Sequence, residues 1–169
     1  MRILGIDPGL RLTGYGCVER AAPASGSARH RAPERVGLVE AGVIRLDPRA
    51  PVPDRLAELD HDFRALLDRL RPAAVAVEML FAHYKHPATA IVMGHARGVL
   101  LLAIRRAGLE LVELRPTEVK KSLTGHGHAG KEQMQRAVRD VFGLPTIPKP
   151  PDVADALAVG LCALTRHGR

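Results

Sequence analysis

Cysteine and aromatic residues are both scarce in this sequence, and each scarcity excludes a class of protein. The 169 residues include two cysteines, three phenylalanines, two tyrosines and no tryptophan. Two cysteines, Cys17 and Cys162, are too few for a disulfide framework or a cysteine-based zinc site, which favours a reducing cytoplasm. Five aromatic residues do not supply the base-stacking surface of RNA-recognition or single-strand-binding folds. No apolar leader precedes the charged Asp7, so we expect no signal peptide.

Hydrophobic and basic residues, by contrast, are plentiful. Hydrophobic residues make up 46% of the chain and charged residues 25%, which indicates a soluble protein with a substantial core. The length suits a single domain over residues 1–169. Lysine and arginine total 25 against 18 acidic residues, a net charge of +7 that predicts a polyanionic partner.

Apolar periodicity predicts strands that alternate with helices after an opening run of strands. This pattern is typical of an α/β fold with a mixed central sheet flanked by helices. A stretch rich in Ala, Pro, Ser, Gly and Arg, residues 20–35, is expected to be a long connection. We expect strands at residues 2–6, 13–19, 36–46, 73–77 and 109–114, and helices at residues 54–70, 87–106, 116–123, 131–142 and 152–165.

The helix expected over residues 87–106 is apolar on nearly all sides. Such a helix is buried on both sides, either in the centre of the protein or in a subunit interface. His95, Arg97 and Arg105 interrupt it, so we do not expect it to cross a membrane.

Four acidic residues stand where a sheet and a helix present side chains together. Asp7 and Glu78 each end an apolar strand, and ligands of open α/β sheets gather beyond such ends. Asp152 and Asp155 are three residues apart at the start of the last helix and project from the same face. Each also has a structural interpretation: Asp7 begins a Pro-Gly turn, Glu78 marks where a strand reaches water, and Asp152 and Asp155 complement a helix N-terminus, Asp152 as its N-cap.

Four carboxylates held together need a cation. Two ionised carboxylates ~5 Å apart cost ~3 kcal/mol at an effective dielectric constant of ~20. Hard oxygen ligands suit Mg²⁺ or Mn²⁺, and two such ions balance four negative charges and act on both oxygens of a phosphodiester. A basic protein with such a pit is a candidate nuclease.

Several motifs, in order over nearly the whole chain, resemble the RuvC family, the bacterial Holliday-junction (crossover junction) endodeoxyribonucleases of the RNase H-like superfamily. The combination is specific, although no single motif is. The motifs are Gly5-Ile6-Asp7-Pro8-Gly9, Thr13-Gly14-Tyr15-Gly16, Glu78 followed by Phe81, His95-Ala96-Arg97-Gly98, and Asp152-Val153-Ala154-Asp155-Ala156.

The resemblance implies a homodimer that makes paired symmetric nicks in a four-way DNA junction, with the RuvA–RuvB branch-migration complex as a further partner. It assigns metal binding and catalysis to Asp7, Glu78, Asp152 and Asp155, with Mg²⁺ or Mn²⁺, two per site. The role of Asp152 is the least fixed, since the family also has histidine at that position.

DNA contacts are expected from basic and aromatic residues near the carboxylates. Arg115 and the residues after it include nine Lys or Arg and five Asp or Glu, so basic charge gathers beside the last carboxylates. The resemblance places functional lysines at Lys120 and Lys131, while solvated helix faces remain the alternative. It also implies that Phe81 stacks on a base, whereas core packing is the ordinary role. The remaining candidate DNA contacts are Tyr84, Lys85 and Lys121.

Three other functions remain as rivals. They are an RNase H-like nuclease acting on RNA or a hybrid, an actin-like ATPase lobe, and a DNA-binding module without catalysis. The whole-chain resemblance disfavours the first, and 169 residues leave no room for the second lobe of the ATPase. Retention of all four carboxylates disfavours the third.

Overall fold

A five-stranded mixed sheet forms the centre of the computed structural model, which describes residues 1–20, 36–79 and 87–167. The strand order is β3-β2-β1-β4-β5. The first three strands are antiparallel neighbours, while β4 and β5 run parallel to β1. The strands are β1 (Arg2–Asp7), β2 (Leu12–Arg20), β3 (Val36–Arg45), β4 (Ala74–Glu78) and β5 (Glu110–Leu114).

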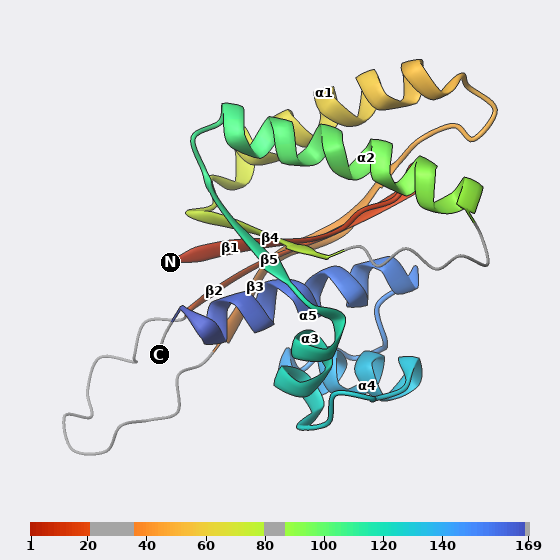
Figure 1. Ribbon diagram of the computed structural model, residues 1–169. Coiled ribbons are helices and arrows are strands. Elements are labelled where there is room, and N and C mark those ends of the chain that lie inside the picture. The colour runs from red at the N-terminus through yellow and green to blue at the C-terminus, as the bar shows by residue number, and fades with distance from the viewer. Residues whose placement is uncertain (21–35, 80–86, 168–169) are drawn as a thin grey trace, which may run out of the picture.

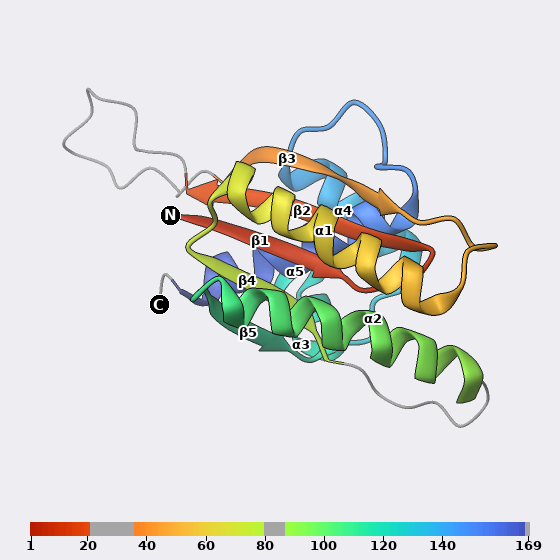
Figure 2. The same cartoon turned by 90° about the horizontal axis from the view of Figure 1, so that it is seen from above.

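Helices cover both faces of this sheet, as Figures 1 and 2 show. Helices α1 and α2 lie side by side on one face. Helix α5 crosses the other face, with α3 and α4 packed beyond it (Figure 1). The helices are α1 (Val52–Leu70), α2 (Pro87–Arg106), α3 (Pro116–Thr124), α4 (Lys131–Val141) and α5 (Pro151–Arg166). The α/β prediction and all ten expected elements are confirmed, with ends that differ by one or two residues. The connection expected over residues 20–35 lies outside the described part except for Arg20, which ends β2.

Strand alternation divides the core into two layers. In β1, Leu4 and Ile6 pack with α1 and α2, where Phe63 and Leu100 are fully buried. Ile3 on the opposite side of the strand packs with α5. Alternate residues of a strand lie on the same face, so Gly5 and Asp7, like Ile3, lie on the side of β1 that faces α5.

Helix α2 is buried on one side only. Ala96, Leu100, Ala103 and Ile104 are buried, but Ile91 and Leu102 are 60% and 49% exposed. The alternative that this helix is central is therefore wrong. Within the described residues, Ala88–Arg106 is the one helix long and apolar enough to cross a membrane, with 22% of that window buried. Its inner side packs on the sheet, which accounts for part of its apolar character.

Helix α5 lies unusually close to β1 and β2 because glycines face it. A Cβ added to Gly5 would lie 2.1 Å from the carbonyl oxygen of Ala156 and 2.3 Å from the backbone nitrogen of Gly160. A Cβ on Gly16 would lie 2.7 Å from the side chain of Leu157. At Gly5 the atoms that an added Cβ would meet all belong to the backbone of α5, so no flexible side chain is able to move away from it. The glycines thus fix the depth at which α5 rests on the sheet.

We predict that Gly5→Ala destabilises the protein by about 3 kcal/mol or more, because the methyl group forces α5 away from β1. Urea unfolding followed by circular dichroism measures the loss. The matched control is Gly37→Ala, since a Cβ there meets its nearest atom at 3.8 Å. Equal stabilities of the two variants would contradict this role of Gly5.

Candidate active site

Asp7 and Glu78 end neighbouring parallel strands. The register pairs Ile6 of β1 with Val77 of β4, so the next residues along are Asp7 and Glu78. Adjacent strands lie about 4.8 Å apart, and both side chains have the parity that faces α5. Both carboxylates are largely buried, and the predicted meeting of strand ends is what the structure has.

Asp152 and Asp155 enter from the first turns of α5. The helix is capped at Pro150 and begins at Pro151, so the alternative of Asp152 as N-cap is wrong. A Cβ on Gly14 would lie 2.1 Å from the carbonyl oxygen of Asp152, and Gly14 is the sheet partner of Asp7. The absence of a side chain at Gly14 therefore lets the start of α5 approach Asp7.

Burial, followed by repulsion from neighbouring carboxylates, raises the pKa of Asp7, Glu78 and Asp155. For Asp7 the burial, followed by the charges of Asp155, Asp152 and Glu78, raises the pKa to about 7. Burial also raises the pKa of Glu78 and of Asp155, and the charge of Asp155 adds to the effect on Glu78. The group is thus a concentration of negative charge that its own surroundings do not neutralise.

Two of the predicted lysines lie at this pit. A cavity of about 270 Å³ is lined by Lys120 of α3 and Lys131 of α4 together with Glu78 and Asp155. The Nζ of Lys131 is 3.8 Å from Oδ2 of Asp155, and its charge offsets part of the rise that burial causes in the pKa of that carboxyl. The charge of Lys120 likewise offsets part of the rise that burial causes in the pKa of Glu78. Lys121 lines a different groove on the other side of α3.

The donor set fits a hard divalent cation. All four groups are carboxylates, while Cys17 and Cys162 are buried elsewhere as free thiols. Among the described residues no three His, Cys, Asp or Glu side chains converge into a ready-made metal site.

A buried threonine holds the loop that follows Asp7, a feature the sequence analysis missed. Thr13 is fully buried and is the one buried polar residue in residues 1–20, 36–79 and 87–167. Its Oγ1 donates to the carbonyl oxygen of Gly9 at 2.6 Å and accepts from the Gly9 N–H at 3.3 Å. Arg55 of α1 donates to the carbonyl oxygen of Leu10 in the same loop. In the sequence, the signal for this contact was a threonine four residues after the glycine of the Pro-Gly turn.

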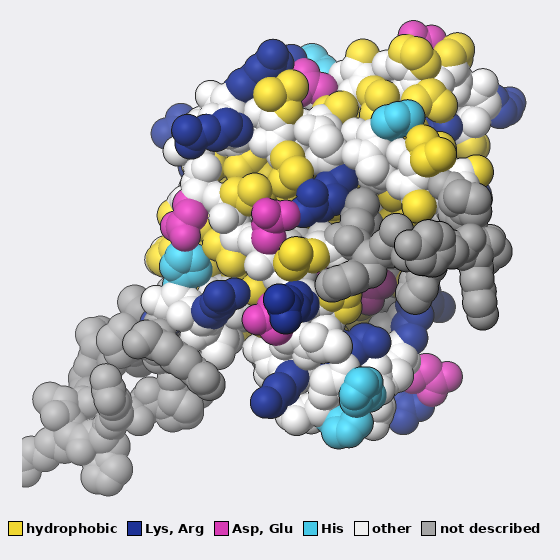
Figure 3. Space-filling view, viewed as in Figure 1, with side chains coloured by type: hydrophobic (Ala, Val, Ile, Leu, Met, Phe, Trp, Pro, Cys, Tyr) yellow, Lys and Arg dark blue, Asp and Glu magenta, His cyan; other side chains and the backbone are white. Residues whose placement is uncertain are grey.

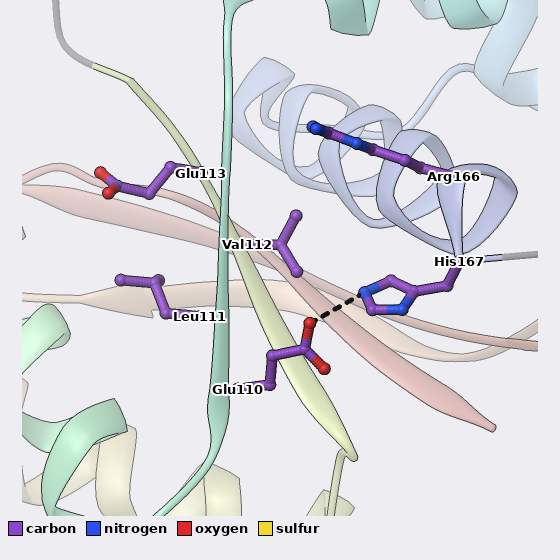
Figure 4. A pocket seen from close by; sticks show the side chains of 6 residues that line it. All are labelled: Glu110, Leu111, Val112, Glu113, Arg166 and His167. Carbon is purple, nitrogen blue, oxygen red and sulfur yellow. Dashed lines mark ion pairs between the residues drawn. The ribbon is translucent and has the colours of Figure 1, made fainter.

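Phe81, Tyr84 and Lys85 fall outside the described residues. A larger hollow lies apart from the pit. A cavity of about 400 Å³ lies between β5 and the end of α5, where Nε2 of His167 is 3.4 Å from Oε1 of Glu110 (Figure 4). None of the four carboxylates lines this cavity, so the volume of a cavity does not by itself locate the candidate active site.

The chain is similar to known proteins over nearly its whole length. Residues 3–163 match the family model described as crossover junction endodeoxyribonuclease RuvC. A protein of that name from Chloroflexus aggregans is 44% identical over 162 residues, 96% of this chain and 92% of the relative. The structure described as T. thermophilus RuvC in complex with Holliday junction substrate is 35% identical, with a TM-score of 0.84 over 99% of this chain and 96% of that one. The yeast mitochondrial Holliday junction resolvase, 16% identical with a TM-score of 0.64 over 98% of this chain and 80% of that one, shares the fold.

The raised pKa of Asp7 makes a prediction about stability. Its folded-state pKa, about 7, lies above the ordinary 3.8, so the folded protein holds a proton that the unfolded chain releases. The stability of the metal-free protein therefore falls as pH rises from 4 to 7. We expect Asp7→Asn to remove the part of this fall that Asp7 contributes and to stabilise the metal-free protein at pH 8 by at most about 4 kcal/mol.

Thermal unfolding in EDTA between pH 4 and 8 tests this difference between variant and parent. The exposed Asp68→Asn change serves as the control. Added Mg²⁺ is expected to raise the Tm of the parent more than that of Asp7→Asn, because it binds the folded carboxylates. An Asp7→Asn protein less stable than its parent at pH 8 in EDTA would contradict the crowded-charge description.

Proposed function

Since the chain belongs to the crossover junction endodeoxyribonuclease RuvC family, with its RNase H-like fold, we propose that it resolves four-way DNA junctions by paired symmetric nicks. The observation that carries this proposal is the pit of four carboxylates flanked by Lys120 and Lys131 on a basic protein. The enzyme acts in DNA recombination and repair, and its substrate is the Holliday junction.

Asp7, Glu78, Asp152 and Asp155 are the residues we assign to metal binding and catalysis. These carboxylates would hold two Mg²⁺ or Mn²⁺ ions, which would supply activation of a water molecule and neutralisation of charge on the leaving oxygen. Lys120 and Lys131 face the same cavity and stabilise the negative charge that develops on the scissile phosphate. Thr13 keeps the loop after Asp7 in one conformation, and thereby orients the carboxylate.

Phe81, Tyr84, Lys85 and Lys121 complete the proposed DNA contacts. Phe81 is assigned to stacking on a base near the branch point, as the family motif implies. The RuvA–RuvB complex is the proposed partner in the cell. Both cysteines are free thiols, which is in keeping with a cytoplasmic enzyme.

The exposed side of α2 is the surface we assign to the homodimer. Ile91 and Leu102 are eleven residues apart and so lie on one helix face, with Gly94 and Gly98 between them. An added Cβ at either glycine would meet nothing within 4 Å. A second α2 is therefore able to pack closely on this stripe, which would bury its exposed apolar side chains.

Cleavage assays test the enzymatic proposal. We expect paired symmetric nicks in a synthetic four-way junction with Mg²⁺ or Mn²⁺, no cleavage in EDTA, and little cleavage of linear duplex. Asp7→Asn and Glu78→Gln should lower the rate at least about a hundredfold while junction binding persists, because they remove a metal ligand. Asp68→Asn is the control. Equal cutting of linear duplex would refute the junction specificity, and full activity of either variant would refute the assigned pit.

Sedimentation analysis tests the dimer. Leu102→Asp should shift the protein to monomer, since it places a charge in the proposed apolar contact. Val141→Asp on α4 is the control, because Val141 is 46% exposed and lies outside the α2 surface. A Leu102→Asp protein that remains dimeric would exclude this interface.

A further inference from the structure

A second groove lies between the same two helices that form one side of the proposed active site. Its volume is about 410 Å³. Helix α3 contributes Glu118, Lys121 and Ser122, and α5 contributes Cys162, Thr165 and Arg166. The carboxylates of the pit do not line it, so it is a separate feature of the surface.

The groove and the pit are two parts of one seam. Asp155, Ala158 and Val159 of α5 line the pit, and Cys162, Thr165 and Arg166 continue the same spacing of three and four residues. From Asp155 to Thr165 the helix rises about 15 Å. Helix α3 crosses between the two hollows, because Pro116, Val119 and Lys120 line the pit and the groove residues lie on the other side of this helix.

The charged groups of the groove leave it available to an anion. Within the described part of the chain, neither Lys121 nor Arg166 has a carboxylate oxygen within 4 Å, whereas Arg2, Arg69 and Arg97 each have one. The one acidic lining residue, Glu118, accepts a hydrogen bond of 2.8 Å from the backbone N–H of Arg115. Lys and Arg side chains gather over α3 and the C-terminal half of α5 on the face shown in Figure 3.

The floor of the groove adds a neutral donor. Ser122 is exposed on α3 and lines the groove beside the buried free thiol of Cys162. Lys121, Arg166 and the Ser122 hydroxyl thus present three donors at one opening. Such a set suits the non-bridging oxygens of a phosphate.

We propose that this groove binds a second backbone phosphate of the cleaved DNA strand, about two to four nucleotides from the scissile phosphate. The inference rests on the proposed function, because it needs a strand that already lies in the pit. From there the strand crosses α3 between Lys120 and Lys121, whose side chains serve the two hollows in turn. The proposal gives Lys121 a specific contact, the second backbone phosphate. It also adds Ser122 and Arg166 to the DNA-binding surface.

Junction binding is measured in the non-cleaving Asp7→Asn background with Mg²⁺, over a series of salt concentrations. We expect Lys121→Gln combined with Arg166→Gln to weaken binding about fivefold to tenfold and to reduce the slope of log affinity against log salt by about 1. Arg106→Gln is the matched control, since this exposed arginine ends α2 on the opposite face of the sheet. Unchanged circular dichroism and Tm verify that the double variant is folded.

A phosphate scan locates the contact. Single neutral methylphosphonates are placed along the cleaved strand, one to six nucleotides from the scissile bond on either side. For the protein with an intact groove, one methylphosphonate about two to four nucleotides from the scissile bond should weaken binding. For the double variant, the methylphosphonate at that position should have no effect, while the effects at all other positions should be unchanged.

The outcomes separate the two proposals. Junction binding with unchanged affinity and an unchanged salt slope in the double variant overturns the groove and leaves the proposed function intact. An equal loss in Arg106→Gln also overturns it, because the effect is then one of net charge. A parent protein that shows no preference for four-way junctions overturns the proposed function itself.

Discussion

The close contact of α5 with β1 and β2 is the constraint on which the rest of this structure depends. Gly5 and Gly14 have no Cβ, and a Cβ at either position would lie 2.1 Å from a carbonyl oxygen of the helix. The contact at Gly5 fixes the depth of α5. The contact at Gly14 brings the first turn of the helix to the end of β1, and so brings Asp152 and Asp155 toward Asp7.

This packing produces electrostatic repulsion among the carboxylates, and the proposed function makes use of that repulsion. Apolar contacts and backbone fit hold the helix in place, and they bring negative charges together in a partly buried space. The raised pKa of Asp7, Glu78 and Asp155 records that cost. Under the proposed function, divalent cations would relieve this cost, so the same geometry that weakens the metal-free protein would favour metal binding. Lys120 and Lys131 offset only part of the charge, which leaves room for cations as well as phosphate.

The two faces of the sheet serve different purposes. The α5 face carries the pit, the lysines of α3 and α4, and the seam that continues to Lys121 and Arg166. The opposite face carries α1 and α2, with an exposed apolar stripe on α2. The proposed DNA cleavage and the proposed self-association therefore use opposite faces of the sheet. The proposed dimer contact thus leaves the pit of each subunit open.

The sequence by itself determined the elements and the chemical types at the site. Period-two and helical patterns are local, so the ten elements and the ends of β1 and β4 followed from them. Four carboxylates, with family motifs around them, indicated a metal-dependent nuclease. Tertiary structure alone decided what depends on distant contacts. It buried Thr13, placed Lys120 at the pit and Lys121 at the groove, and exposed one side of α2. Local patterns do not encode which face of a helix meets the sheet or how closely two backbones approach, because those follow from packing between residues far apart in the chain.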